Sequence, residues 1–192
     1  PEACLRHDVR RLLYPSTVAV YDFSGTAPVT EASPLDPQPE RRSHYARAKI
    51  ASEALLAEMR GARFLPVVIL RPGVVVGQRG RPLHSGVGQW PRDVQCVGWG
   101  SGKTSIPFVL AEDVASAFLA ALDAPGIEGA SFNLAGDVRL TAREYVAELA
   151  RSTGRPIRFH PVPRLLTQAS DVFKWLVKAA IRKPGNVFPS SR

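Results

Sequence analysis

The sequence has few of the features that hold small secreted proteins together or place a chain in a membrane. Its two cysteines, Cys4 and Cys96, have no paired spacing, and it shows no N-terminal apolar secretion segment. A disulfide framework or a cysteine metal site therefore has nothing to build on, and a reducing cytoplasm is the expected compartment. The longest strongly apolar run, residues 64–70, is far shorter than the roughly 20 residues that cross a bilayer. We expect a cytoplasmic protein that does not span a membrane.

Acidic side chains are also in the minority, with 17 Asp and Glu against 25 Lys and Arg and a formal net charge of +8. Such a balance favours anionic partners, among which nucleic acid must be considered. The basic residues are scattered, however, and no aromatic residues are interleaved with them as they are on surfaces that stack bases. We therefore predict a solvated basic surface, a small molecule as the partner, and no nucleic acid.

Two apparent ligand sites lack residues that such sites require. Residues 100–104, Gly-Ser-Gly-Lys-Thr, look like a phosphate-binding loop, but Val97 occupies the place of the required first glycine and Pro107 blocks a long following helix. The four histidines have neither mutual spacing nor carboxylates arranged as a metal site. The sequence thus predicts no P-loop and no bound metal.

Hydrophobic periodicity indicates strands that alternate with helices. Buried strands are predicted at residues 9–14, 66–70, 108–110 and 131–134, with shorter ones at 94–97 and 156–160. Helices are predicted at residues 2–7, from Ser43 as N-cap to Gly61, at 112–122, from a capping box of Thr141 and Glu144 to about 153, and at 164–181. Residues 71–105 are rich in glycine and show weak periodicity. This alternation means an α/β fold with a parallel sheet.

Tyr45 and Lys49 form the strongest candidate for chemistry. They lie four residues apart on a predicted helix, so their side chains share one face. A nearby cation favours the phenolate form of a phenol, and a hydroxyl such as that of Thr17, at the end of a predicted strand, can hold a substrate oxygen beside it. Together these groups could move a proton on and off an alcohol or carbonyl. A Tyr and Lys pair at this spacing is also a common structural feature, so the pair alone decides nothing.

Several landmarks follow one another in a specific order. Ser16 and Thr17 precede Val20 and Tyr21, and an acidic loop with prolines occupies residues 28–37. Residues 45–49 then read YxxxK, and Leu-Arg-Pro-Gly at 70–73 ends a strand. Two later motifs lie at residues 108–115 and 132–136. YxxxK alone is a weak signal, but the ordered set is strong. It resembles the extended short-chain dehydrogenase/reductase family, also called the NAD-dependent epimerase/dehydratase family.

The resemblance implies an α/β fold: the C-terminal part of a doubly wound, Rossmann-type parallel sheet plus a small substrate-binding region. Residues 1–72 would be the second half of a dinucleotide-binding domain. Residues 73–192 would be a mixed substrate-binding region, with returning Rossmann elements near 107–135. A homodimer formed through the helix that carries Tyr45 is also compatible with the family, because Leu55, Leu56 and Met59 leave room for it.

The resemblance further implies NAD or NADP as the cofactor and assigns roles to individual residues. Thr17 would orient the substrate oxygen and Tyr45 would be the acid and base. Lys49 would hold the cofactor ribose and favour the phenolate form of Tyr45. The backbone groups of Pro72 and Gly73 would lie near the nicotinamide carboxamide. Tyr45, Lys49, Pro72 and Gly73 are thus the expected cofactor contacts.

Three positions depart from the family pattern. No Gly-rich phosphate loop precedes Tyr14, so the chain is expected to lack half of its cofactor site. Ile106 stands where members that act on nucleotide sugars usually carry an Arg. Asp22 stands where the family often has Gly, which leaves the geometry of that loop open. Four basic residues on the substrate side could replace the missing Arg: Arg79, Arg81, Arg92 and Lys103.

The sequence therefore favours an NAD(P)-dependent oxidoreductase or epimerase that acts on a secondary alcohol or ketone carbon, including that of a sugar nucleotide. One alternative is a reductase or dehydrogenase of a non-phosphorylated hydroxy or keto compound, which Ile106 favours slightly. The other is a non-catalytic scaffold that binds a dinucleotide, since a fold alone does not prove activity. The presence of Thr17, Tyr45 and Lys49 together argues against the scaffold.

Overall fold

The computed structural model describes residues 1–25 and 27–162, so the helix predicted at 164–181 lies outside the described residues. The described elements are α1 (Glu2–Arg6), β1 (Leu12–Pro15), η1 (Val18–Val20), η2 (Pro39–Arg41), α2 (His44–Arg63), β2 (Val67–Pro72), β3 (Val74–Val76), β4 (Gly88–Arg92), β5 (Gln95–Trp99), β6 (Phe108–Leu110), α3 (Ala111–Asp123), β7 (Ser131–Leu134), α4 (Ala142–Thr153) and β8 (Arg158–Val162). They belong to two compact units, one of residues 1–75 and 109–135, the other of residues 76–108 and 136–162. That residues 1–72 bind the dinucleotide and residues 73–192 bind the substrate stays a prediction.

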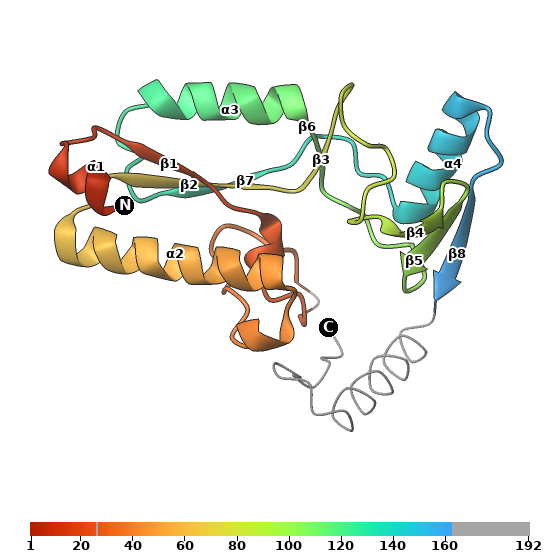
Figure 1. The fold of residues 1–192 in the computed structure, drawn as a ribbon, viewed down its shortest axis with the longest axis horizontal. Coiled ribbons are helices and arrows are strands. Elements are labelled where there is room, and N and C mark those ends of the chain that lie inside the picture. Colours follow the sequence, from red (N-terminus) through yellow and green to blue (C-terminus); the bar gives the residue numbers. More distant parts are fainter. Residues whose placement is uncertain (26, 163–192) are drawn as a thin grey trace. The chain divides into compact units, whose positions relative to one another are not determined.

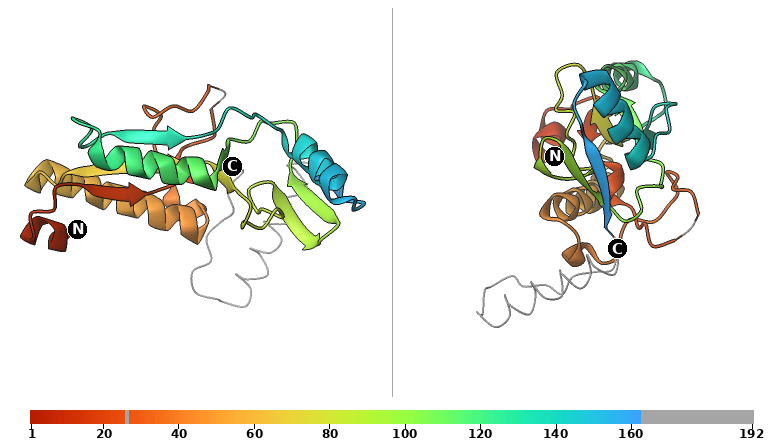
Figure 2. Two further views of the ribbon diagram at one scale, coloured as in Figure 1. Left: turned by 90° about the horizontal axis from the view of Figure 1, so that it is seen from above. Right: turned by 90° about the vertical axis from the view of Figure 1, so that its right-hand side faces the viewer.

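The first unit is a parallel sheet in the order β1-β2-β7, with α2 on one face and α3 on the other (Figure 1). The three strands also lie side by side when this unit is seen from above (Figure 2). Side chains alternate between the faces of a strand. Val67 and Ile69 therefore pack with Leu56 and Met59 of α2, whereas Val68 and Leu70 pack with Ala121 of α3. The predicted α/β fold with a parallel sheet is confirmed.

α2 begins where the sequence predicts and ends later. The Ser43 hydroxyl caps it by accepting the Ala46 N–H at 3.2 Å. The predicted stop at Gly61 is wrong, because the helix continues to Arg63 and ends with Phe64 in a left-handed conformation at φ 54°. Gly61 is not among the residues with positive φ and lies inside the helix. The chain turns at Phe64, directly before Leu65 enters the core with 1% exposure.

The apolar side chains expected to serve a dimer are mostly used within the chain. Leu56 and Met59 are buried in the core between α2 and the sheet. Leu55 alone of the three is exposed. The sheet therefore covers two of the three side chains on which the homodimer expectation rests, and the homodimer stays a prediction.

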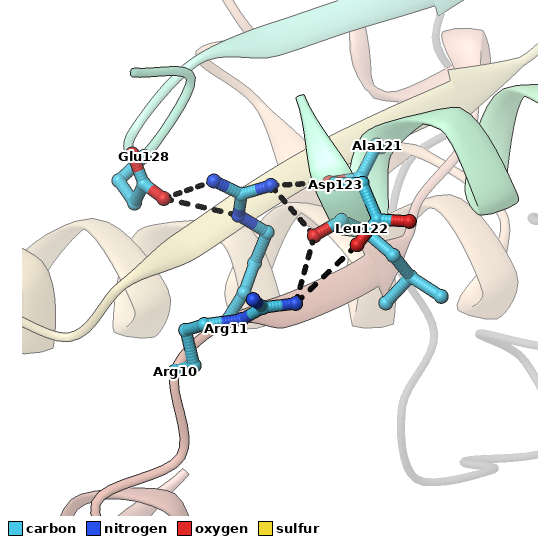
Figure 3. Close-up of polar contacts among 6 residues, drawn as sticks. All are labelled: Arg10, Arg11, Ala121, Leu122, Asp123 and Glu128. Carbon is cyan, nitrogen blue, oxygen red and sulfur yellow. Dashed lines mark hydrogen bonds and ion pairs between the residues drawn. The ribbon is translucent and has the colours of Figure 1, made fainter. Parts of the chain in front are cut away.

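Two arginines that precede β1 hold the end of α3. Arg11 donates to the carbonyls of Ala121 at 2.7 Å and Leu122 at 3.0 Å and also pairs with Glu128, while Arg10 reaches Leu122 and Asp123 (Figure 3). The last turn of α3 has no basic residue of its own. These two cations from the segment before β1 thus satisfy its terminal carbonyls and complement its dipole. β1 accordingly begins at Leu12, later than the predicted residue 9.

The second unit contains the antiparallel pair β4 and β5, with β8 parallel to β5, and α4. The capping box of Thr141 and Glu144 forms as predicted. β3 and β4 lie in the region of weak periodicity and were not predicted. Residues 100–104 form a turn in which Gly102, at φ 70°, packs under Phe159. The carbonyl of Gly102 accepts the Arg143 N–H at 3.3 Å. This turn is part of the packing of the unit.

Candidate active site

The candidate site lies at the carboxyl edge of the parallel sheet. β1 ends at Pro15, β2 at Pro72 and β7 at Leu134, and parallel strands end at one edge. Gly73 directly follows the end of β2, and Thr17 lies two residues after the end of β1. Ligands of open α/β sheets bind outside this edge. The first turns of α2 reach the same edge, as the contact of Lys49 with Pro15 shows.

Lys49 joins α2 to the end of β1. Its Nζ donates to the carbonyl oxygen of Pro15 at 2.6 Å. The ammonium lies 4.9 Å from the ring centroid of Tyr14 and 6.0 Å from that of Tyr45, within reach of a cation–π interaction. An ammonium has three donors, and the bond to Pro15 uses one of them. Lys49 is therefore fixed beside Tyr45 with donors to spare.

Tyr45 stands in the first turn of α2, one turn before Lys49. It is 57% exposed, although aromatic side chains usually contribute most when buried. The structure thus brings the predicted pair together and leaves the phenol open to a ligand.

Thr17 follows the same strand end two residues after Pro15. Its backbone is extended at φ −163°, and its hydroxyl accepts the N–H of Ala19 at 3.2 Å, which caps the short helix η1. A hydroxyl that accepts one hydrogen bond still has its own hydrogen to donate. Thr17 is buried, with 8% exposure. Its predicted role as the group that orients a substrate oxygen stays a prediction.

Pro72 and Gly73 end the central strand. The N–H of Gly73 donates to the carbonyl of Leu134 at 2.9 Å, and proline has no N–H. The backbone N–H of Gly73 is thus already hydrogen-bonded, and Pro72 has no N–H to donate. A contact between this segment and a carboxamide would therefore use carbonyl oxygens as acceptors of the carboxamide N–H groups.

A buried polar network that the sequence reasoning missed lies beneath the site. The carboxylate of Glu53 accepts Arg71 Nη2 at 2.6 Å and Nε at 3.0 Å, and it also accepts the hydroxyl of Ser16. Arg71 Nη1 donates to the Tyr21 hydroxyl at 2.6 Å, which donates to Asn133 Oδ1 at 2.8 Å. The network therefore links α2 with residues on or next to all three strands of the sheet.

The charges of this network reinforce one another. Burial by itself lowers the pKa of Arg71, but the hydrogen bonds and the charge of Glu53 outweigh it and raise that pKa above its usual value. At the rim, the N–H of Asn133 donates to the Glu31 carboxylate at 2.8 Å and lowers the pKa of Glu31. Arg71 adds to that lowering through its charge.

One signal in the sequence could have revealed Glu53 and Arg71 as the pair at the centre of this buried network. Buried residues recur along α2 at Ala46, Ile50, Glu53, Leu56 and Met59, so a carboxylate occupies a core position of the helix. A buried carboxylate needs a partner of opposite charge. An arginine at the end of an otherwise apolar strand supplies one.

The basic residues considered as a substrate clamp lie in the second unit. Arg79, Arg81, Arg92 and Lys103 are all exposed. Within the part of the chain that the structure describes, their side chains have no hydrogen-bond or ion-pair partner. The backbone N–H of Ile106 donates to the Leu140 carbonyl at 2.9 Å, within the same unit.

The described residues contain neither a helix suited to a membrane nor a cluster of metal ligands. None of the helices at 1–25 and 27–162 is long and apolar enough to cross a membrane. In the same residues no group of three or more His, Cys, Asp or Glu side chains is arranged to hold a metal ion.

Comparison with known proteins places these features in context. Residues 1–135 match the model of the NAD dependent epimerase/dehydratase family. A Bacillus subtilis (strain 168) protein described as the uncharacterized UDP-glucose epimerase YtcB is 27% identical over 183 residues, covering 93% of this chain and 56% of that protein.

Solved structures resemble the chain to a similar degree. UDP-glucuronic acid 4-epimerase from Bacillus cereus, in complex with UDP-glucuronic acid and NAD, is 26% identical with a TM-score of 0.68, over 84% of this chain and 52% of that one. UDP-glucose 4-epimerase from Thermus thermophilus, in complex with NAD, is 26% identical with a TM-score of 0.65, over 84% and 54%. The chain spans about half the length of these relatives.

Proposed function

The chain belongs to the NAD-dependent epimerase/dehydratase family, and on that premise we propose that its protein is an NAD(P)-dependent epimerase or oxidoreductase that acts on a secondary alcohol carbon of a sugar nucleotide. The observation that carries the proposal is the bond from Lys49 to the carbonyl of Pro15. It holds the YxxxK pair against the strand end that leads into Thr17. The nucleotide sugar and NAD in the Bacillus cereus relative support the choice of substrate and cofactor.

The residues at the sheet edge fit the ribose and nicotinamide half of a dinucleotide. Lys49 keeps donors for ribose hydroxyls, and Tyr45 is exposed beside it. The carbonyls of Pro72 and Gly73 would accept the carboxamide N–H groups. When bound, the nicotinamide would supply the acceptor and donor of hydride.

Proton transfer would fall to Tyr45. In its deprotonated form Tyr45 would take the proton of the substrate hydroxyl, and it would return that proton when the carbonyl is reduced again. Thr17 would donate its hydroxyl hydrogen to the same substrate oxygen and so keep that oxygen beside Tyr45. In an epimerase the carbonyl would be reduced from the opposite face, whereas in an oxidoreductase it would leave as product.

Replacement of the phenol tests this assignment in the full-length protein. Tyr45→Phe should lower kcat with UDP-glucose or UDP-glucuronic acid by about a hundredfold or more and leave NAD binding nearly intact. Tyr145→Phe, which removes a phenol bonded to the Pro82 carbonyl in the second unit, is the matched control and should keep its rate. Unchanged turnover in Tyr45→Phe would remove Tyr45 from the mechanism.

Lys49 has two proposed tasks, so its replacement should have two effects. Lys49→Met removes both the ribose donor and the cation beside the phenol, and we expect weaker NAD binding as well as a lower kcat. Calorimetric titration with NAD measures the first effect and steady-state kinetics the second. Normal NAD affinity in this variant would contradict the assignment.

A second candidate is a reductase of a non-phosphorylated hydroxy or keto compound, favoured by Ile106 in place of the usual Arg. A diphosphate would need charge-assisted hydrogen bonds, each worth about 1.5 to 3 kcal/mol. If the substrate is a sugar nucleotide, Arg92→Gln with Lys103→Gln should raise its KM at least tenfold. Calorimetric titration of the NAD-loaded protein with UDP distinguishes the two substrate classes without a kinetic assay. The absence of measurable heat would favour the non-phosphorylated substrate.

A further inference from the structure

Two hydrogen bonds, one helical turn apart, join α2 to two consecutive residues at the end of β1. Lys49 donates to the Pro15 carbonyl, and the Ser16 hydroxyl donates to the Glu53 carboxylate. Residues four apart lie on one face of a helix, so both contacts arise from the same side of α2. A single contact would allow α2 to pivot about it. Two contacts fix both the rotation of the helix and its position along the strand end.

Glu53 itself is held from the opposite side. Arg71 of β2 gives its carboxylate two hydrogen bonds and passes a third to the hydroxyl of Tyr21. The side chains of Glu53 and Arg71 are 2% and 7% exposed, and Tyr21 is fully buried. Such a network, whose donors and acceptors are paired away from water, is rigid. The Glu53 carboxylate is therefore a fixed point to which the Ser16 hydroxyl is attached.

Thr17 follows Ser16 directly, and this order gives the contact its consequence. We propose that Ser16 and Glu53 are positioning residues that set the place of the Thr17 hydroxyl relative to Tyr45 and Lys49, and that proton transfer depends on this contact. The inference rests on the proposed function. Ser16 and Glu53 are 5% and 3% exposed, so they act through Thr17 and not on the substrate.

The contact can be broken from either end without removing a buried charge. Ser16→Ala deletes the hydroxyl and leaves Glu53 paired with Arg71. Glu53→Asp keeps the charge but withdraws the carboxylate by one methylene. Ser52→Ala is the matched control, because its hydroxyl donates to the Ala48 carbonyl within α2 and does not reach the strand.

Kinetics of the full-length, NAD-loaded protein provide the first readout. Each of Ser16→Ala and Glu53→Asp should lower kcat at least tenfold, with KM and NAD affinity changed less than twofold, and Ser52→Ala should change none of them. The double variant should be no slower than the slower single variant, since both changes break one contact. A lower melting temperature with unchanged kcat would overturn the proposal and leave the contact as structural only.

Amide hydrogen exchange gives a second readout that needs no turnover. The N–H groups of Val20 and Tyr21 donate to the carbonyls of Thr17 and Val18, so they report on the segment that carries Thr17. Ser16→Ala should raise their exchange rates at least tenfold, and Ser52→Ala should not. Equal rates in both variants would overturn the proposal. A wild-type protein without turnover would refute the proposed function alone, and the exchange rates would still decide whether Ser16 holds the segment.

Discussion

Removal of one charge from the buried pair of Glu53 and Arg71 should destabilise the first unit severely. Glu53→Gln keeps the shape of the side chain and an acceptor for Ser16 but leaves the Arg71 guanidinium without its counter-charge. Loss of one partner of a buried ion pair costs about 3 to 5 kcal/mol, because the remaining charge stays desolvated. Both side chains are almost fully buried, so water cannot replace the missing partner.

Removal of both charges should cost less than removal of one. Glu53→Gln with Arg71→Met leaves no unpaired charge in the core, and the Tyr21 hydroxyl keeps Asn133 as its acceptor. Replacement of a buried pair by uncharged groups of similar volume is often close to neutral. We therefore expect the double variant to be more stable than the single variant Glu53→Gln.

Urea unfolding of the full-length protein, followed by far-ultraviolet circular dichroism, measures the difference. With a slope of about 2 kcal/mol per molar urea, the midpoint of Glu53→Gln should fall by roughly 1.5 to 2.5 M. Glu148→Gln is the matched control, since Glu148 pairs with Arg151 at the surface and its loss should leave the midpoint unchanged. A fall of less than about 0.5 M for Glu53→Gln, or a double variant less stable than the single one, would refute the reasoning.

Three further substitutions and one chemical modification test other parts of the structure. A Cβ at Gly98 would lie 1.9 Å from the Phe159 ring, so Gly98→Ala should destabilise the protein by about 1 to 3 kcal/mol in the same urea assay. Gly61 lies in a helix with open space around it, so Gly61→Ala should stabilise the protein by about 0.5 to 1 kcal/mol. Thr141→Ala removes the N-cap of α4 and should cost about 1 kcal/mol, and an unchanged midpoint would contradict the cap. Burial raises the pKa of Cys96 to about 11, so iodoacetamide at pH 8 should modify it only in denaturant, as mass spectrometry of its peptide would show.

The sequence specified those features of the fold that depend on neighbours along the chain. The start of α2 at Ser43 and the capping box of Thr141 follow from side chains that bond backbone groups three residues away. The continuous burial of β2 follows from an unbroken apolar run. The shared face of Tyr45 and Lys49 follows from the helical repeat alone. Each of these could be predicted because its geometry is local.

Two short strands, β3 and β4, escaped prediction for a related reason. β3 spans three residues and β4 contains a proline and a register shift, so neither shows a regular alternation of polar and apolar residues. Their partners hold them in the extended conformation. The end of α2 shows the same principle, because burial of Leu65 and not the glycine at 61 decides where the helix stops.

The arrangement of the candidate site depended on the tertiary structure. The sequence by itself determined that Tyr45 and Lys49 face the same way, but the partner of Lys49 is a carbonyl 34 residues earlier. Glu53 and Arg71 are 18 residues apart, and Tyr21 and Asn133 are 112 apart. These groups meet only because β2 lies between β1 and β7 and α2 packs across them. Buried charges and hydroxyls take the partners that the strand order brings within reach, and strand order is set by the packing of the whole unit.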